Sequence, residues 1–217
     1  EGTALAFVVE NTETKEIIES NFPTVIIDMH NDNTSVVTSN NEQGCRMAIQ
    51  YLYDLGHKKI AHITGMKDDC NWISNVRKNS YINEMKRLNL TIKEEYIQKG
   101  NNFDFDSGYS AMKKLLNMEE KPTAVFAASD KLALGAIEAI KDEGFEVPND
   151  ISVIGFDDSE LCQYVTPKLT TVRQSCDLIG KEAANIVIEQ INKKEKLKIN
   201  KVVPVKLIIR ESCARVK

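Results

Sequence analysis

Short apolar segments recur along the chain and alternate with helical patterns, and this alternation constrains the fold more than any other feature. The candidate strands are residues 5–9, 24–27, 59–64, 124–127 and 152–156. Continuous apolar runs, rather than alternating ones, are typical of parallel strands that helices cover on both faces. We therefore expect an α/β fold built on parallel sheets.

Helical patterns fill the intervals between these strands. The predicted helices are residues 45–55, 75–88, 107–116, 133–140 and 179–193. Gly56 and Gly144 follow two of them, and a glycine just past the last apolar residue is a common helix stop. Strand, helix, strand, helix in regular order is the pattern of α/β domains.

Composition excludes several classes of protein. Lys plus Arg is 28 and Asp plus Glu is 32, so the net charge is 28 − 32 = −4. A mildly acidic chain is a poor nucleic-acid binder by itself, because phosphate contacts need clustered Lys and Arg. No apolar run approaches the roughly 18 residues that span a bilayer. We expect no membrane partner.

The cysteines and histidines indicate a reducing environment and no metal. Five cysteines, an odd number with no CxxC spacing, argue against a disulfide framework. None of the three histidines has metal-ligand spacing to a cysteine. We expect a cytoplasmic protein without a metal or another cofactor.

Polar residues follow several of the predicted strands. In open parallel sheets, ligands bind beyond the carboxyl ends of the strands. Asp28, Ser129 and Asp157 occupy such positions. Carboxylates accept hydrogen bonds from neighbouring hydroxyls, and Arg77 could offer donors in a fixed fork. Phe103 could stack on a sugar ring, so these residue types suit a ligand rich in hydroxyls.

Each of these residues also has a purely structural interpretation. Ser129 is placed to cap a helix, and Asp157 to form a turn. Arg77 could lie on a helix surface. Phe103 could be part of the core. The residues alone leave both interpretations open.

Catalytic patterns are weak. No GxSxG, HExxH or P-loop string is present. His57 follows a glycine that ends a predicted helix, so we expect it in a surface turn. His62 lies within an apolar predicted strand, so we expect its ring to pack. A glycosidase pair among Asp28, Asp130 and Asp157 is conceivable. We expect that the protein is not an enzyme.

Several strings, taken together, resemble the LacI/GalR-type transcriptional regulators. In family order they are GHxxIA at 56–61, PTAxxxxxDxxAxG at 122–135, VPxDISVxGFDD at 147–158, PxLTTV at 167–172 and RxS at 210–212. One such string would be weak evidence. Five in register are specific, and they cover most of the chain.

The resemblance implies a type I periplasmic-binding-protein-like fold, with two parallel-sheet lobes joined by a three-segment hinge. The expected lobes are a partial N-terminal lobe of 1–38 plus 176–203 and a C-terminal lobe of 39–175 plus 204–217. Family domains begin with two further strand–helix units and follow a helix-turn-helix. This sequence shows neither, so we expect an incomplete N-terminal lobe and a DNA-binding domain absent from this chain.

The resemblance also implies a function. The chain would be the effector-binding domain of a repressor, would sense a small sugar or related polyol in a cleft between the lobes, and would couple it to operator DNA through the missing domain. The family motifs place the ligand contacts at Asp28, Arg77, Phe103, Ser129, Asp157 and Gln174.

The same resemblance implies a homodimer, with tentative contacts at Leu134, Tyr164 and Val165. A solute-binding protein of a sugar transporter would share the fold and is the alternative function.

Overall fold

The computed structural model describes residues 1–6, 12–66 and 71–216. They divide into two compact units: unit 1 is residues 1–40 with 175–205, and unit 2 is residues 41–174 with 206–217. The chain passes between the units three times, after Asn40, Gln174 and Val205.

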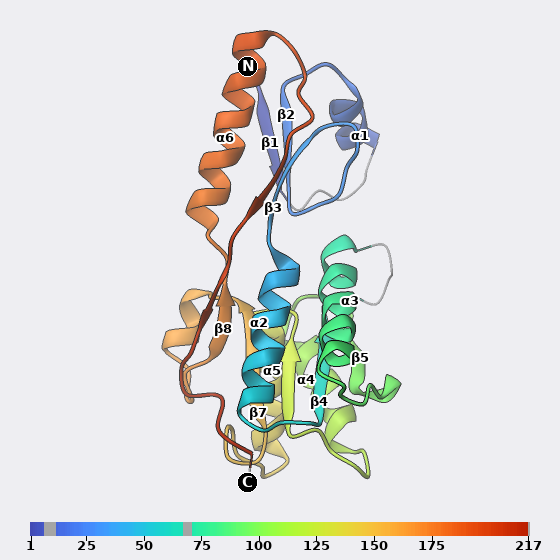
Figure 1. Cartoon of the computed structure of the whole chain (residues 1–217), viewed down its shortest axis with the longest axis vertical. Helices are drawn as coiled ribbons and strands as arrows, with labels where there is room; N and C mark the ends of the chain where they lie inside the picture. The colour runs from blue at the N-terminus through green and yellow to red at the C-terminus, as the bar shows by residue number, and fades with distance from the viewer. Residues whose placement is uncertain (7–11, 67–70, 217) are drawn as a thin grey trace. The chain divides into compact units, whose positions relative to one another are not determined.

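Unit 1 is built on a four-stranded sheet. Its elements are β1 (Thr3–Ala6), α1 (Thr12–Glu19), β2 (Thr24–Ile27), β3 (Ser35–Ser39), α6 (Cys176–Lys193) and β9 (Asn200–Val203). The strand order is β1-β2-β3-β9, all parallel, with α6 along one side and α1 on the other (Figure 1). Ile179, Ala183 and Ile186 of α6 pack on Val25 and Val37 of the sheet. The strand predicted at 5–9 begins earlier, at residue 3, and its residues 7–9 lie outside the described residues.

Unit 2 is built on a six-stranded sheet. Its elements are α2 (Asn41–Asp54), β4 (Ile60–Thr64), α3 (Trp72–Arg87), a 3-10 turn η1 (Glu94–Tyr96), β5 (Ile97–Lys99), α4 (Phe105–Leu116), β6 (Ala124–Ala127), α5 (Asp130–Asp142), β7 (Ser152–Asp157), a second 3-10 turn η2 (Glu160–Gln163), β8 (Thr170–Arg173) and β10 (Lys206–Ile208).

The strand order of unit 2 is β10-β8-β7-β6-β4-β5. Five of these strands are parallel, which confirms the predicted fold class. The exception is β10, which pairs antiparallel with β8. It is an edge strand, where an antiparallel partner needs no helical crossover.

Helices cover both faces of this sheet. Ala61 and Ile63 of β4 belong to one core with Met112 and Leu115 of α4 and with the buried side of α5. Alternate residues of the strands face the opposite side of the sheet, where Phe156 of β7 contacts α2 at Gly44. Burial on both faces explains why the strands read as continuous apolar runs.

Local signals fix the helix ends near the sheet. Asn71 and Asp104 cap α3 and α4 by accepting hydrogen bonds from the backbone N–H groups of Ser74 and Ser107, both at 2.8 Å. Gly56 ends α2 with a φ of +95°, a conformation that favours glycine.

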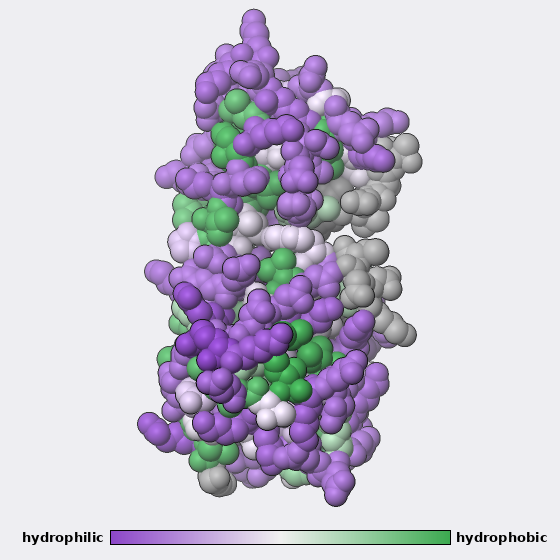
Figure 2. All heavy atoms as spheres, turned by 45° about the vertical axis from the view of Figure 1, so that its right-hand side comes forward, coloured by the Kyte–Doolittle hydropathy of each residue, from purple (hydrophilic) through white to green (hydrophobic). Residues whose placement is uncertain are grey.

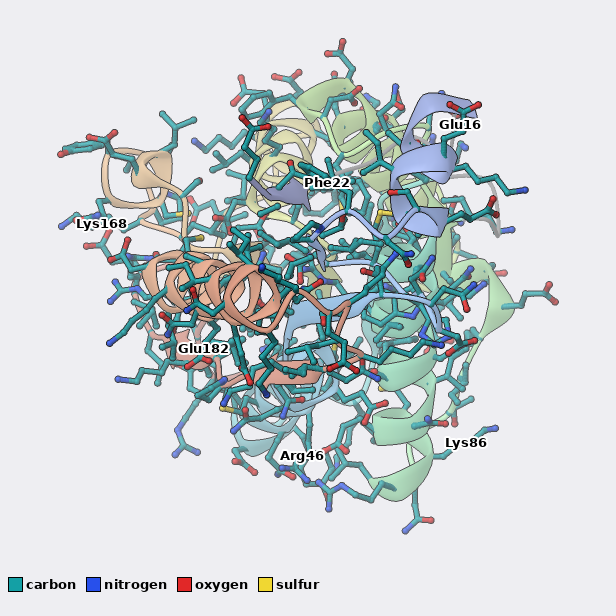
Figure 3. All side chains as sticks on the ribbon, turned by 90° about the horizontal axis from the view of Figure 1, so that it is seen from above. Glu16, Phe22, Arg46, Lys86, Lys168 and Glu182 are labelled. Atoms are coloured by element: carbon teal, nitrogen blue, oxygen red, sulfur yellow. The ribbon has the colours of Figure 1, made fainter. Side chains whose placement is uncertain are left out.

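Most charged side chains lie on the outer faces. Arg46 of α2 and Lys86 of α3 point outward from the ribbon (Figure 3), and hydrophilic side chains cover most of the face drawn in Figure 2. Among the described residues, no helix combines the length and the apolar character that crossing a bilayer requires.

The predictions for the two histidines of unit 2 have different outcomes. The prediction of a surface turn at His57 is wrong: the ring is buried, with Nδ1 2.9 Å from Thr123 Oγ1 and Nε2 3.0 Å from the Ala214 carbonyl. The C-terminal segment supplies that carbonyl, a contact that no local pattern reveals. The prediction of packing at His62 is confirmed, because its ring stacks between Tyr81 and Phe126.

Candidate functional site

The carboxyl ends of the parallel strands of unit 2 gather most of the predicted ligand residues. Asp157 ends β7, Gln174 follows β8, and Ser129 lies two residues beyond β6. Phe103 follows β5, and Arg77 reaches the end of β6 from α3, because it bonds to the Ala128 carbonyl. The sixth predicted residue, Asp28, belongs to unit 1.

Arg77 is buried and held from three directions. Its side chain is 3% exposed. Its Nε donates to Asn41 Oδ1 at 2.8 Å, and its Nη1 donates to the backbone carbonyl of Ala128. The guanidinium also lies over the Phe156 ring, 3.6 Å from the centroid, a cation–π contact. The charge is therefore fixed in place rather than free on the helix surface.

Asp157 is the accessible partner of this charge. Its Oδ1 lies 3.7 Å from Arg77 Nη1 and accepts a hydrogen bond from Gln174 Nε2 at 2.6 Å. The Asp157 side chain remains 39% exposed. A partly exposed carboxylate beside a buried guanidinium and a side-chain amide offers both acceptors and donors to a polyhydroxylated ligand.

Ser129 has the structural role of a helix cap, which its position in the sequence predicts. Its hydroxyl caps α5 by accepting from the N–H of Leu132 at 3.3 Å. The neighbouring Asp130 accepts from Thr171 Oγ1 at 2.5 Å and from the N–H of Ser159 at 2.6 Å. Burial raises the pKa of Asp130 above its ordinary value. A ligand contact at Ser129 stays a prediction.

Phe103 packs against the carboxyl end of β4. A Cβ atom added at Gly65 would lie 2.2 Å from Phe103 Cε1, so the ring occupies the space that the glycine leaves. Phe103 is partly buried on the α4–α5 core. The ring is therefore both a core residue and partly accessible, and neither interpretation of the sequence excludes the other.

Asp28 has a structural task within unit 1. It follows β2, and its Oδ1 accepts from Thr38 Oγ1 and from the N–H of Ser39, each at 3.0 Å. Its φ of +53° is unusual for a residue with a side chain. These bonds tie the ends of β2 and β3 together. A ligand contact at Asp28 stays a prediction.

Sequence reasoning missed the residues that support this site. Asn41 orients Arg77 across 36 residues of sequence, and Phe156 reads simply as a core residue of its strand. Asp158 is paired with Arg173 and Arg210. No local pattern could reveal these contacts, although the GFDD and RxS strings include Asp158 and Arg210.

The described residues offer no metal centre. Among residues 1–6, 12–66 and 71–216, no group of three or more His, Cys, Asp or Glu side chains is placed to hold an ion. The cysteines in that part of the chain, Cys45, Cys162, Cys176 and Cys213, are free thiols.

A groove of about 450 Å³ lies elsewhere on unit 2, beside α4 and α5. Leu134 and Val165 line it together with Phe105 and Leu161. Leu134 and Val165 are also partly buried against the core. Tyr164, next to Val165, is 73% exposed.

Comparison with known proteins identifies the relatives of this chain. Residues 49–213 match the family model of the periplasmic binding protein-like domain. The HTH-type transcriptional repressor PurR of Histophilus somni (strain 129Pt) is 38% identical over 193 residues, which are 88% of this chain and 57% of PurR. The chain thus spans little more than half the length of the curated relatives it matches.

Solved structures of transcriptional regulators also match this chain. A regulatory protein of the LacI family from Chloroflexus aggregans has a TM-score of 0.88 and 27% identity, covering 99% of this chain and 77% of that one. The complex of the transcriptional regulator CelR with cellobiose has a TM-score of 0.88 and 30% identity, covering 97% of this chain and 65% of that one.

Proposed function

This chain belongs to the periplasmic-binding-protein-like family, among the LacI/GalR-type transcriptional regulators, and from that premise we propose that it is the effector-binding domain of a repressor that senses a small sugar or related polyol.

The pairing of Arg77 with Asp157 carries the proposal. Each sugar hydroxyl both donates and accepts a hydrogen bond, so it can bridge a carboxylate and a guanidinium that lie side by side. Arg77 Nη1 and Asp157 Oδ1 are 3.7 Å apart, and Gln174 adds a side-chain amide to the same carboxylate. Phe103, at the same sheet edge, offers an apolar face for a sugar ring. The cellobiose bound by the relative CelR supports this ligand class.

In the whole protein, effector binding would control operator DNA. A ligand shifts an equilibrium between conformations only through its different affinity for each. The chain's net charge of −4 disfavours direct contact with DNA, so operator binding is assigned to another part of the whole protein. The repressors among its relatives favour this regulatory function over a transporter's solute-binding protein. The free thiols support a cytoplasmic location.

The partner proposed for the groove beside α5 is a second copy of the chain. Phe105, Leu161 and Tyr164 are large apolar or aromatic side chains with 42%, 48% and 73% exposure. Aromatic and aliphatic side chains gathered on one surface are typical of the buried centre of an interface. Leu134, Tyr164 and Val165 are the predicted contacts.

Calorimetric titration tests the effector site. The chain is titrated with pentoses, hexoses, cellobiose and nucleobases. For the sugar that binds, Arg77→Ala and Asp157→Ala should each weaken affinity at least tenfold, about 1.4 kcal/mol. The control is Lys131→Ala, an exposed position on α5 close to the same sheet edge. Changes of less than threefold in both site variants would mean that the effector binds elsewhere, and binding of nucleobases alone would overturn the sugar class.

A further inference from the structure

We propose that Asp158 and Arg210 are positioning residues for Asp157. The buried ion pair between them ties the turn that carries Asp157, the proposed effector-binding carboxylate, to the C-terminal segment. Only the effector role of Asp157 rests on the proposed function. The positioning itself is a property of the chain without effector.

The turn needs such support because its backbone is strained. Asp157 has a φ of +121° and Asp158 a φ of +59°. Residues with side chains rarely adopt positive φ, and two in succession persist only when the surrounding structure holds them. The segment at residues 157–159, named here the β7 turn, connects β7 to η2.

Asp158 is the point at which the β7 turn is held. Its side chain is 3% exposed, with Oδ1 2.6 Å from Arg210 Nη2 and Oδ2 accepting a hydrogen bond from Arg173 Nε. The contact with Arg210 is a charge contact without aligned hydrogen-bond geometry. One buried carboxylate thus faces two guanidinium groups, one from β8 and one from the C-terminal segment.

Arg210 is itself fixed to the edge of the sheet. Its Nη1 donates to the Leu169 carbonyl at 2.8 Å, and its backbone N–H donates to Thr170 Oγ1 at 2.9 Å. On the other side of the β7 turn, the Ser159 N–H donates to Asp130 at 2.6 Å. The turn is therefore anchored to β8, to the C-terminal segment and to α5.

These contacts distinguish the two adjacent aspartates. Asp158 is buried and cannot reach a ligand, whereas Asp157 is 39% exposed beside Arg77 and Gln174. If the buried pair is broken, the backbone can relax to negative φ, which turns the Asp157 side chain away from Gln174. Asp158, the second aspartate of the GFDD string, and Arg210, the arginine of the RxS string, therefore share the task of positioning Asp157.

The side-chain amide of Gln174 reports the position of Asp157 without any effector. Its Nε2 donates to Asp157 Oδ1 at 2.6 Å, so its protons should exchange with water at least tenfold more slowly than those of a free glutamine. NMR measures this exchange in the parent chain and in Arg210→Gln and Asp158→Asn. We expect both variants to lose the protection while Arg210→Lys retains part of it. Gln174→Glu assigns the signal.

Leu115→Ala separates positioning from general loss of stability. Leu115 is fully buried in the α4–α5 core and is not part of the β7 turn. This variant should keep the Gln174 protection even where its thermal midpoint falls as far as that of Arg210→Gln. If Arg210→Gln does not fold, Arg173→Gln, whose side chain is half exposed, carries the same expectation.

Protection that persists in folded Arg210→Gln and Asp158→Asn, or that is lost equally in Leu115→Ala, would overturn the positioning role. A failure of the sugar titration would leave this result unaffected, so the two proposals are tested separately.

Discussion

The guanidinium carbon of Arg77 lies 3.6 Å from the centroid of the Phe156 ring, and both side chains are buried. Phe156 directly precedes Asp157, so the ring that supports the cation and the carboxylate beside it come from one strand. This arrangement fixes the geometry of the candidate site before any ligand arrives.

A double-mutant cycle measures the contact between Arg77 and Phe156. Arg77→Met keeps an unbranched side chain, and Phe156→Leu keeps an apolar one. We expect a coupling of about 1 to 2 kcal/mol in the free energy of unfolding by urea, because a desolvated cation on an aromatic face is worth about that much. Phe126→Leu, at an equally buried ring, is the control partner and should show no coupling to Arg77→Met. Equal coupling to both rings would contradict a specific contact.

Acid should destabilise the chain through His62. Burial lowers the pKa of His62 to about 4, from an ordinary value of 6.5. Its Nδ1–H donates to the Phe126 carbonyl at 2.8 Å, and Nε2 is buried without a hydrogen-bond partner among the described residues. Between pH 6.5 and 4 the unfolded chain therefore binds a proton that the folded chain does not. Stability should fall by about 2 kcal/mol between pH 7.5 and 5 from this group.

The measurement for His62 is urea unfolding at several pH values. His62→Gln keeps a donor for the Phe126 carbonyl but does not titrate, so its stability should depend less steeply on pH. Identical slopes in the parent chain and the variant would show that His62 is not the source of the acid sensitivity.

Gly65→Ala should displace Phe103. The added methyl group would lie 2.2 Å from Phe103 Cε1, far inside van der Waals contact, so the ring must move. We expect a loss of about 1 to 3 kcal/mol in the free energy of unfolding, as for other overpacked cores. Combining it with Phe103→Leu should recover part of that loss. Strictly additive effects would show that the clash is relieved elsewhere.

Tyr164→Glu should weaken the proposed dimer. The side chain is 73% exposed, so a charge there should change the stability of the monomer by less than about 0.5 kcal/mol, while a charge in a buried interface opposes association. Sedimentation measures the oligomeric state, with Glu119→Lys on a different surface loop as the control. A parent chain that stays monomeric at high concentration would contradict the predicted partner.

The helices α2 to α5 of unit 2 and its strands β4, β6 and β7 could be predicted from the sequence, whereas β5, β8 and β10 were not predicted. β6 occupies the predicted residues 124–127, since its side chains are apolar on both faces and buried. In unit 1, β3 and β9 were not predicted. Their polar residues, including Ser35, Asn200 and Lys201, give no continuous apolar run, and only pairing with neighbouring strands defines them.

The candidate site could be predicted only in part. Motifs and strand ends indicate Asp157 and Arg77, but the sequence does not reveal that Asn41 and Phe156 hold Arg77, or that Asp158 and Arg210 are paired. Those contacts join segments far apart in the chain, and they depend on the packing of helices on the sheet rather than on any local pattern.

The most direct measurement of the central claim is a map of backbone amide shifts as the selected sugar is added to the isotope-labelled chain. We expect the largest changes at the carboxyl edge of the unit 2 sheet, at Gly65, Ala128, Asp157 and Gln174. Changes gathered instead at the opposite edge, around His57, Thr123 and Ser152, would contradict it.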